Sequence, residues 1–157
     1  MLTPAQKITL LTAIQADSAA NALYVNGDLA GLADYLNAPA SPEFIVWKSS
    51  VTLPEIQNNG FDWVRVDNLS VGKARIWEWM FLATGEINPS KANVRAGIDE
   101  TWKGTAADLA VRDAVYVHCK RPASWFERVF ATGTGSTGTP ALLGIEGPVS
   151  TFELIGL

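Results

Sequence analysis

The sequence contains few of the residues on which metal and thiol chemistry depends. Its 157 residues include one cysteine, one histidine and two methionines. A single cysteine excludes a disulfide within the chain. No apolar run approaches the roughly 18 residues that cross a bilayer, so we expect no contact with a membrane.

Charge of either sign is also scarce, because charged residues make up only 18% of the chain and the net charge is −4. A domain dedicated to DNA binding usually carries a basic field, and this balance argues against one. The charges are uneven: residues 1–47 contain one base and four acids, whereas residues 48–128 contain eleven bases and ten acids. Either a function that depends on charge lies in the middle of the chain, or the middle is simply where the exposed helices are.

The remaining composition is that of an ordinary globular protein, with 48% hydrophobic and 10% aromatic residues. The length predicts a single domain over residues 1–157. We predict a mainly α fold, a compact helical domain of about five to six helices with minor short β segments. An extended Gly/Thr-rich loop or arm is expected over residues 131–148, and a C-terminal tail over residues 149–157.

A capping signal predicts the first helix. Thr3 is a candidate N-cap, and Ile8, Leu11 and Ile14 are spaced to form an apolar side. This helix is expected to continue to Asn26.

The stretch after the proline-rich breaker at residues 38–42 is ambiguous. Residues 43–51 contain a β-branched and aromatic run that fits either a strand or a helix. Thr52 is a candidate cap for a single helical turn. Residues 58–60 are expected to form a turn, and residues 61–66 an extended segment.

The middle of the chain gives the clearest helix signals. Ser70 is a candidate cap for a helix over residues 71–84, and Asn88 is expected to open another. Pro122 cannot continue a helix without strain, so a new helix is expected over residues 122–130.

Two capping boxes are expected, in which a hydroxyl and a carboxylate three residues apart close a helix start. Thr105 with Asp108 predicts a helix whose apolar side carries Val117, and Ser150 with Glu153 predicts a short helix near the end.

The motifs with catalytic potential lack the context that their chemistry needs. Residues 133–138 match G-x-G-x-x-G, but a helix-like segment precedes them and no helix start follows, which argues against a nucleotide site. His118 and Cys119 are neighbours on one helix and point in different directions, which argues against a shared metal. We therefore expect no catalytic residue, no cofactor and no metal.

A basic cluster with aromatic neighbours is the strongest candidate for a binding surface. The bases of this cluster are Lys120, Arg121 and Arg128, with Arg112 nearby, and Trp125 and Phe126 lie among them in the sequence. Arginine beside aromatic rings can bind nucleic acid. The same residue types are enriched in protein interfaces, and an ordinary amphipathic helix would also contain them.

Six tryptophans are many for a chain of this length. Trp77 and Trp79 cannot lie on one face of a helix. One of them is therefore expected to face away from the local core, which favours either a second contact surface or a helix buried on two sides.

Several strings of residues resemble a family of small proteins encoded among the virion structural genes of tailed bacteriophages and prophages. The likeness covers roughly residues 29–153, and its most distinctive string is FATGTGS at residues 130–136. The other strings lie at residues 36–44, 46–48, 87–90, 94–98, 140–141 and 146–147.

This resemblance implies a virion component that assembles in the host cytoplasm, and the role we expect first is a head–tail connector (adaptor or neck) protein. Such proteins form homo-oligomeric rings between portal and tail and surround the DNA channel. The partners implied are other copies of the chain and the portal and tail or neck proteins, with passing contact to phage DNA. The contact residues expected from this reading are Trp125, Phe126, Arg128, Gly133, Gly135, Gly138, Phe152 and Leu157.

Three alternatives remain open at this point. The first is another virion role, as a tail terminator, a minor capsid protein or a decoration protein. The second is a small nucleotide-binding enzyme that uses residues 133–138, and the third is a DNA-binding accessory protein.

Overall fold

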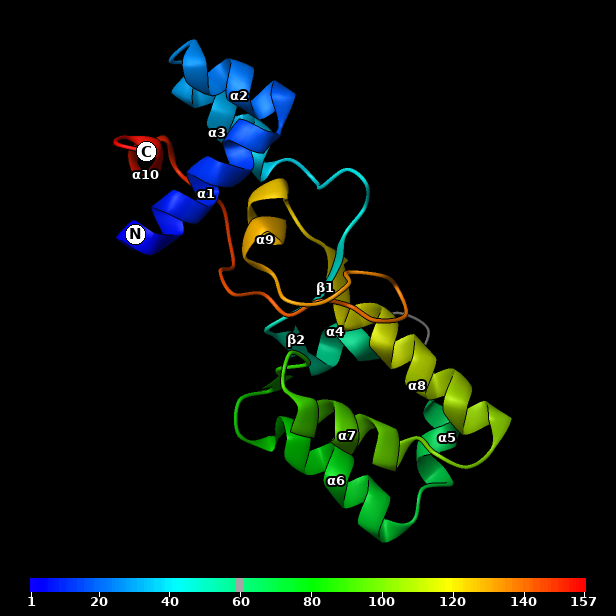
Figure 1. The fold of residues 1–157 in the computed structure, drawn as a ribbon. Helices are drawn as coiled ribbons and strands as arrows, with labels where there is room; N and C mark the ends of the chain where they lie inside the picture. Colours follow the sequence, from blue (N-terminus) through cyan, green and yellow to red (C-terminus); the bar gives the residue numbers. More distant parts are fainter. Residues whose placement is uncertain (59–60) are drawn as a thin grey trace. The chain divides into compact units, whose positions relative to one another are not determined.

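The computed structural model describes residues 1–58 and 61–157 as a mainly α-helical chain with minor β segments (Figure 1). This confirms the fold class expected from the sequence. Contacts within the chain define two compact units: unit 1 contains residues 1–46 and 122–157, and unit 2 contains residues 47–121. The prediction of one domain over the whole chain stays a prediction.

The described residues form ten helices, more than the five or six expected, because four of them have six residues or fewer. The helices of unit 1 are α1 (Pro4–Ala16), α2 (Ser18–Val25), α3 (Leu29–Asn37), α9 (Trp125–Phe130) and α10 (Thr151–Leu154). The helices of unit 2 are α4 (Leu53–Gln57), α5 (Trp63–Asp67), α6 (Val71–Leu82), α7 (Ala92–Thr101) and α8 (Ala106–His118). No helix in the described part of the chain combines the length and apolar composition needed to cross a membrane.

The β structure consists of two short pairs of strands. β1 (Ile45–Trp47) pairs with β4 (Lys120–Pro122), and β2 (Val51–Thr52) pairs antiparallel with β3 (Glu86–Ile87). The ambiguous stretch at residues 43–51 therefore contains strand and no helix.

Side-chain caps explain where most helices begin. Thr3 caps α1 with a complete capping box, Ser70 caps α6, and Thr52 caps the single turn of α4. Both capping boxes expected from the sequence, at the starts of α8 and α10, are present. Each cap satisfies backbone N–H groups that have no partner within the helix, and such a cap contributes about 1 kcal/mol.

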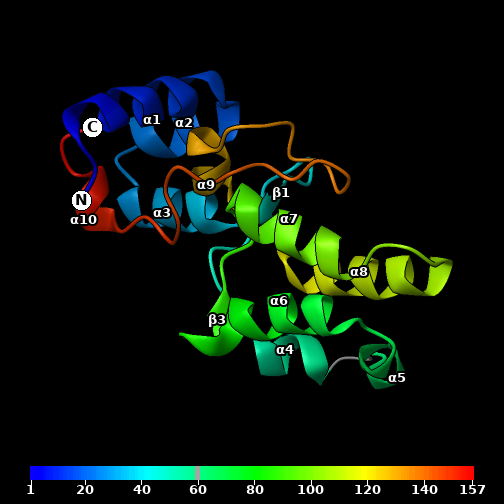
Figure 2. The same ribbon diagram turned by 90° about the horizontal axis from the view of Figure 1, so that it is seen from below.

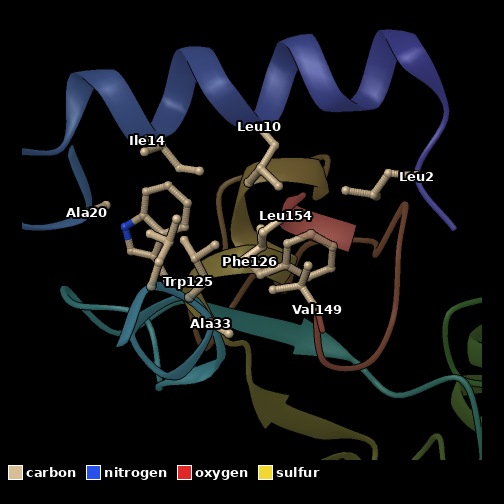
Figure 3. Close-up of a cluster of buried hydrophobic side chains, with 11 residues drawn as sticks. Leu2, Leu10, Ile14, Ala20, Ala33, Trp125, Phe126, Val149 and Leu154 are labelled. Atoms are coloured by element: carbon tan, nitrogen blue, oxygen red, sulfur yellow. The ribbon is translucent and has the colours of Figure 1, made fainter. Parts of the chain in front are cut away.

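The core of unit 1 lies where α1 covers α9 and the C-terminal segment. Leu10 and Ile14 project from α1 toward Trp125 and Phe126, and Leu154 lies beside Phe126 (Figure 3). Residues from both ends of the chain thus share one apolar cluster. Burying each of these large side chains contributes roughly 1.5–3 kcal/mol.

The core of unit 2 is built around aromatic rings. The ring of Trp77 lies 5.4 Å from that of Trp102 and 5.1 Å from that of Phe81, and Phe61 stacks on Trp77 at 6.1 Å. Helices α6 and α7 pack against each other around this cluster (Figure 1 and Figure 2). Such edge-to-face pairs add about 0.5–1.5 kcal/mol each beyond the burial of their area.

The single helix predicted up to Asn26 is wrong, because the chain breaks at Asp17. Asp17 has an extended backbone, and its carboxylate accepts from the amides of Ala19 and Ala20 at 3.0 Å each. It therefore ends α1 and caps α2. The predicted apolar side is also wrong at Ile8, which is 68% exposed.

The apolar side predicted for α8 is wrong as well. Val117 is 70% exposed, whereas Val111 and Val115 are buried in the core of unit 2. Apolar residues lie on more than one side of this helix, so their spacing alone does not identify the buried face.

Three element boundaries also differ from the expectation. The segment 61–66 is not extended, because Asp62 accepts from the amide of Val64 at 3.1 Å and starts α5. The next helix starts at Ala92, after a local turn, instead of at Asn88. The turn expected at 58–60 falls partly on residues 59–60, which lie outside the described residues.

The helix predicted to begin at Pro122 begins later, at Trp125. Pro122 is the last residue of β4, and Ser124 forms a capping box with Glu127 at the start of α9. As predicted, the preceding helix does not continue through Pro122. The strand before it was not predicted, because residues 120–122 do not alternate between apolar and polar.

Candidate interaction surfaces

An apolar groove of about 670 Å³ opens along α1 and α9 in unit 1. Its lining is mainly aliphatic and aromatic, with threonine hydroxyls on one side and two charged residues. The residues that line it are Ile8, Thr9, Thr12, Ala13, Ala16, Asp17, Trp125, Arg128 and Val129. Ile8 is thus exposed because it forms part of this groove and not of the core.

A hydrogen-bonded network fixes the wall of the groove at Asp17. The hydroxyl of Tyr35 donates to the Asp17 carboxylate at 3.1 Å, and Trp125 Nε1 donates to Asp17 Oδ2 at 3.2 Å. The Tyr35 and Trp125 rings lie 6.2 Å apart in a tilted arrangement. The indole of Trp125 is therefore held at one edge by a polar bond while its apolar part packs in the core and reaches the groove.

The hydrogen bonds and burial in this network shift the pKa values of Asp17 and Tyr35 in opposite directions. The hydrogen bond from the Ala20 amide, with those from Tyr35 and Trp125, holds the pKa of Asp17 below its usual range despite its burial. Burial, together with the bond to Asp17, raises the pKa of Tyr35. Asp17 therefore stays an anion and Tyr35 a neutral donor at neutral pH.

Arg128 supplies the positive charge of the groove. Its Nη1 donates to the carbonyl oxygen of Ser41 at 3.2 Å. A guanidinium has five N–H groups in a rigid plane, so this bond orients the side chain and leaves other donors to face the groove. The groove is therefore suited to an apolar side chain accompanied by an acidic or carbonyl group.

Phe126, the neighbour of Trp125, has a different environment. It is 2% exposed, lies in the core of unit 1, and its ring is 5.3 Å from that of Phe130. Of the two aromatic residues expected to make contacts, Trp125 lines the groove, and Phe126 lies in the core beneath it. As a contact residue in its own right, Phe126 stays a prediction.

The Gly/Thr-rich loop is tied to the rest of unit 1. The backbone N–H of Ile45 donates to the Gly135 carbonyl at 2.7 Å, and the N–H of Ala141 donates to the Ile45 carbonyl at 2.9 Å. Gly135 has φ +66, and a Cβ atom there would lie 2.3 Å from the ring of Phe44. Glycine is therefore required at this position by both the backbone and the close approach of the ring.

The other two glycines of the loop differ in their surroundings. A Cβ atom on Gly133 would lie 3.1 Å from the backbone of Ala141, whereas Gly138 faces open space. No helix follows residues 133–138, so the geometry of a dinucleotide-binding loop is not formed.

The C-terminal tail is docked on the first three helices by hydrogen bonds. The Asn37 amide side chain exchanges two hydrogen bonds with the backbone of Val149, at 2.9 and 2.8 Å, and the Tyr24 hydroxyl donates to the Leu157 carbonyl at 2.9 Å. Leu157 is half-buried, but Phe152 is 67% exposed. Of these two expected contact residues, Phe152 offers an apolar side chain at the surface.

The second surface is the outer face of α6, formed by Val71, Arg75, Glu78, Trp79 and Leu82. The three apolar members are each about 70% exposed, and the two charged members are exposed as well. Trp77, on the opposite face, is buried in the core. The expectation that Trp77 and Trp79 face in different directions is thereby confirmed.

The basic cluster expected from the sequence is divided between the two units. Arg128 belongs to unit 1, whereas Arg112, Lys120 and Arg121 belong to unit 2. The Lys120 ammonium lies 5.3 Å from the ring of Trp47, in a cation–π contact within unit 2. Arg128 is therefore the one member of the cluster that lines the groove.

Of the neighbouring histidine and cysteine, His118 is half-buried and Cys119 is buried. Burial raises the pKa of the Cys119 thiol to about 12. A thiol with such a pKa is a poor nucleophile at neutral pH. Within residues 1–58 and 61–157 no group of three or more His, Cys, Asp or Glu side chains is arranged to hold a metal ion.

Sequence reasoning identified Trp125 and Arg128 but missed the α1 side of the groove. The partners of Asp17 lie 18 and 108 residues away in the chain, so no local pattern marks its role. The sequence shows that Ile8 and Leu10 are both apolar. It does not show which of the two faces the core, because that depends on which face of α1 covers α9.

Comparison of the chain with protein-family models, with curated proteins and with solved structures finds no match. No family membership follows from these comparisons. The resemblance to phage virion proteins rests on the strings of the sequence alone.

Proposed function

We propose that the chain is a structural protein of a bacteriophage virion that assembles with copies of itself. Its proposed place is the head–tail connector, as a ring between the portal and the tail around the DNA channel. The sequence strings at residues 87–90 and 130–136 support the virion role. Portal and tail proteins are its proposed partners.

The apolar groove of unit 1 is the observation that carries a binding role. It combines an oriented tryptophan, an oriented arginine and aliphatic walls, and Trp and Arg are the residue types enriched where protein interfaces derive most of their energy. The sequence alone also predicts that Trp125 and Arg128 make contacts. A ring requires two different surfaces on each subunit, and this groove supplies one of them.

The net charge of −4 also fits a channel protein. A wall that neutralises few phosphates holds DNA weakly and lets it pass. The contact with phage DNA is therefore proposed to be transient.

Locating the chain in the intact particle tests this function. We expect imaging of purified virions to show it as one ring at the neck, with a copy number far below that of the shell proteins. Many copies over the shell would indicate a decoration protein, and copies only at the tail end a tail terminator. Absence of the chain from purified virions would contradict the proposal.

A groove variant tests the binding surface itself. Thr12 is exposed and lines the groove, so Thr12→Trp is expected to fill it without disturbing the core. Incorporation into virions should fall at least tenfold, because truncating or blocking an interface centre costs about 2 kcal/mol or more. Val25→Trp, on an exposed site of α2 outside the groove, is the matched control and should assemble normally.

A further inference from the structure

The outer face of α6 carries large apolar side chains that nothing in the described part of the chain covers. On a helix with about 100° per residue, its five members fall within an arc of about 100°, opposite the buried Trp77 and Phe81. Val71, Trp79 and Leu82 are 71%, 69% and 71% exposed. Single exposed apolar residues are ordinary, but three on one face of a helix indicate a contact surface.

The charged residues of this face are of opposite sign and have no ion-pair partner among the described residues. Arg75 and Glu78 are exposed, and both lie near the middle of the helix. The salt bridges of unit 2 use other side chains, such as those of Arg65 and Asp108. The face therefore offers one base and one acid to an incoming partner.

We propose that α6 pairs with α6 of a second copy of the chain, antiparallel and about a two-fold axis. The order of residues along the helix carries this proposal. The midpoint between Val71 and Leu82 falls between Ile76 and Trp77, and the midpoint between Arg75 and Glu78 falls at the same place. An antiparallel pair centred there puts each residue opposite its complement.

In this pairing Val71 of each copy meets Leu82 of the other, and Arg75 of each copy meets Glu78 of the other. The two-fold axis repeats both contacts, so one helix face makes two apolar pairs and two ion pairs. A two-fold contact must be self-complementary in this way, because the same patch serves both subunits. The face meets that requirement in both shape and charge.

Trp79 lies at one edge of this face. The two-fold axis leaves each edge on its own side of the contact, so the Trp79 side chains of both copies lie along the same edge. In this register they are offset by five residues, which is about 7.5 Å along the helix axes. The two indoles are therefore placed to contact each other and to cover that edge of the pairing.

The contact is small and distinct from the ring contacts of the proposed function. Twelve residues give a helix of about 18 Å, so the buried area lies below the roughly 800 Å² per partner of a standard interface. A two-fold contact closes at two copies and cannot extend into a larger ring. The pairing therefore describes the free protein in solution and does not depend on a place in the virion.

Charge exchange on the intact chain tests the pairing by sedimentation equilibrium. We expect a wild-type dimer with a dissociation constant on the order of 10 µM. Arg75→Glu brings acids together across the axis and Glu78→Arg brings bases together, so each variant alone should dimerise at least tenfold more weakly. An equimolar mixture of the two should regain the dimer as a heterodimer, because every facing pair is then of opposite sign.

Trp79→Ala is expected to weaken the dimer on the order of thirtyfold, because it removes the largest apolar side chain of the contact. Val117→Ala is the matched control, since Val117 is equally exposed on a different helix, and it should leave the dimer unchanged. All substituted side chains are exposed, so thermal unfolding should remain close to that of the wild type.

Three results would overturn the pairing. One is a wild-type chain that stays monomeric to about 200 µM. Another is a Trp79→Ala variant that dimerises as tightly as the wild type. The third is a mixture of the charge variants that does not regain the dimer, which would indicate head-to-tail docking of this face on another surface. The location of the chain in virions is independent of all three.

Discussion

The two units of the chain hold their cores together in different ways. Unit 1 joins segments that are far apart in the sequence, and its cohesion includes hydrogen bonds between them, such as those from Asn37 to Val149 and from Tyr24 to Leu157. Asp17 adds a further link by accepting from both Tyr35 and Trp125. Many of these bonds connect a side chain to the backbone of a distant segment.

Unit 2 is one continuous segment, and its core is a cluster of rings. Phe61, Trp77 and Trp102 all lie within 6.1 Å of a neighbouring ring centre. Trp102 is completely buried, and its indole N–H has no hydrogen-bond partner among the described residues. Unit 1 therefore adds polar bonds between distant segments to its apolar cluster, whereas the core of unit 2 is built from packed aromatic side chains.

The largest effect is expected when aromatic volume is removed from unit 2. Trp102→Ala should lower the free energy of unfolding by about 4 kcal/mol, because the cavity cannot be refilled by the surrounding rings. Trp102→Phe should cost much less, because it keeps a ring and removes an N–H that has no partner in the described structure. Urea denaturation measures both. Equal losses for the two variants would contradict a core that depends on aromatic volume.

In unit 1 the corresponding weak point is a polar side chain. Asp17→Ala should lower the free energy of unfolding by about 2 kcal/mol, because it removes the cap of α2 and leaves two donors without an acceptor. Asp28→Ala is the matched control, since Asp28 caps α3 through one exposed hydrogen bond. It should cost about 1 kcal/mol. If both variants lower the free energy of unfolding equally, the hydrogen bonds from Tyr35 and Trp125 to Asp17 add no stability beyond that of a helix cap.

Features of this structure that depend on local interactions were predictable from the sequence, and features that depend on distant interactions were not. The starts of α1, α6 and α8 were predictable, because Thr3, Ser70 and Thr105 cap these helices through residues three positions away. The buried faces of α1 and α8 were not predictable, because several apolar positions fit a helical period and the choice depends on which segment packs on them.

The candidate surfaces were predictable in part for the same reason. Trp125 and Arg128 were recognised by residue type, and helical geometry predicted that either Trp77 or Trp79 faces outward. The α1 side of the groove required the contact between α1 and α9, which joins residues more than 100 positions apart. No pattern within a short window contains that information.

Acid should reveal an electrostatic contribution in unit 2. The hydrogen bonds from Arg65 and from Thr105 hold the pKa of Asp108 well below its usual range. A depressed carboxyl pKa contributes stability above its unfolded value of about 4, and this stability is lost as the pH falls further. The urea midpoint of the wild type should therefore fall below pH 4 more steeply than that of Asp108→Asn. Asp113→Asn, at an exposed carboxylate, is the control and should follow the wild type.

The smallest effect is expected at a surface ion pair. Glu100 and Lys103 form an exposed pair on unit 2, and Glu100→Ala should change the free energy of unfolding by less than about 0.5 kcal/mol. Thermal unfolding at low and high salt measures it. A larger loss would show that unit 2 depends on surface charge as well as on ring packing.

The central claim is that the chain presents surfaces that bind protein, and that one of them, the outer face of α6, binds another copy. Sedimentation equilibrium of the intact wild-type chain between about 1 and 200 µM tests it most directly. The account predicts an average mass that rises with concentration from that of one chain toward that of two. A mass that stays at one chain over the whole range would contradict it.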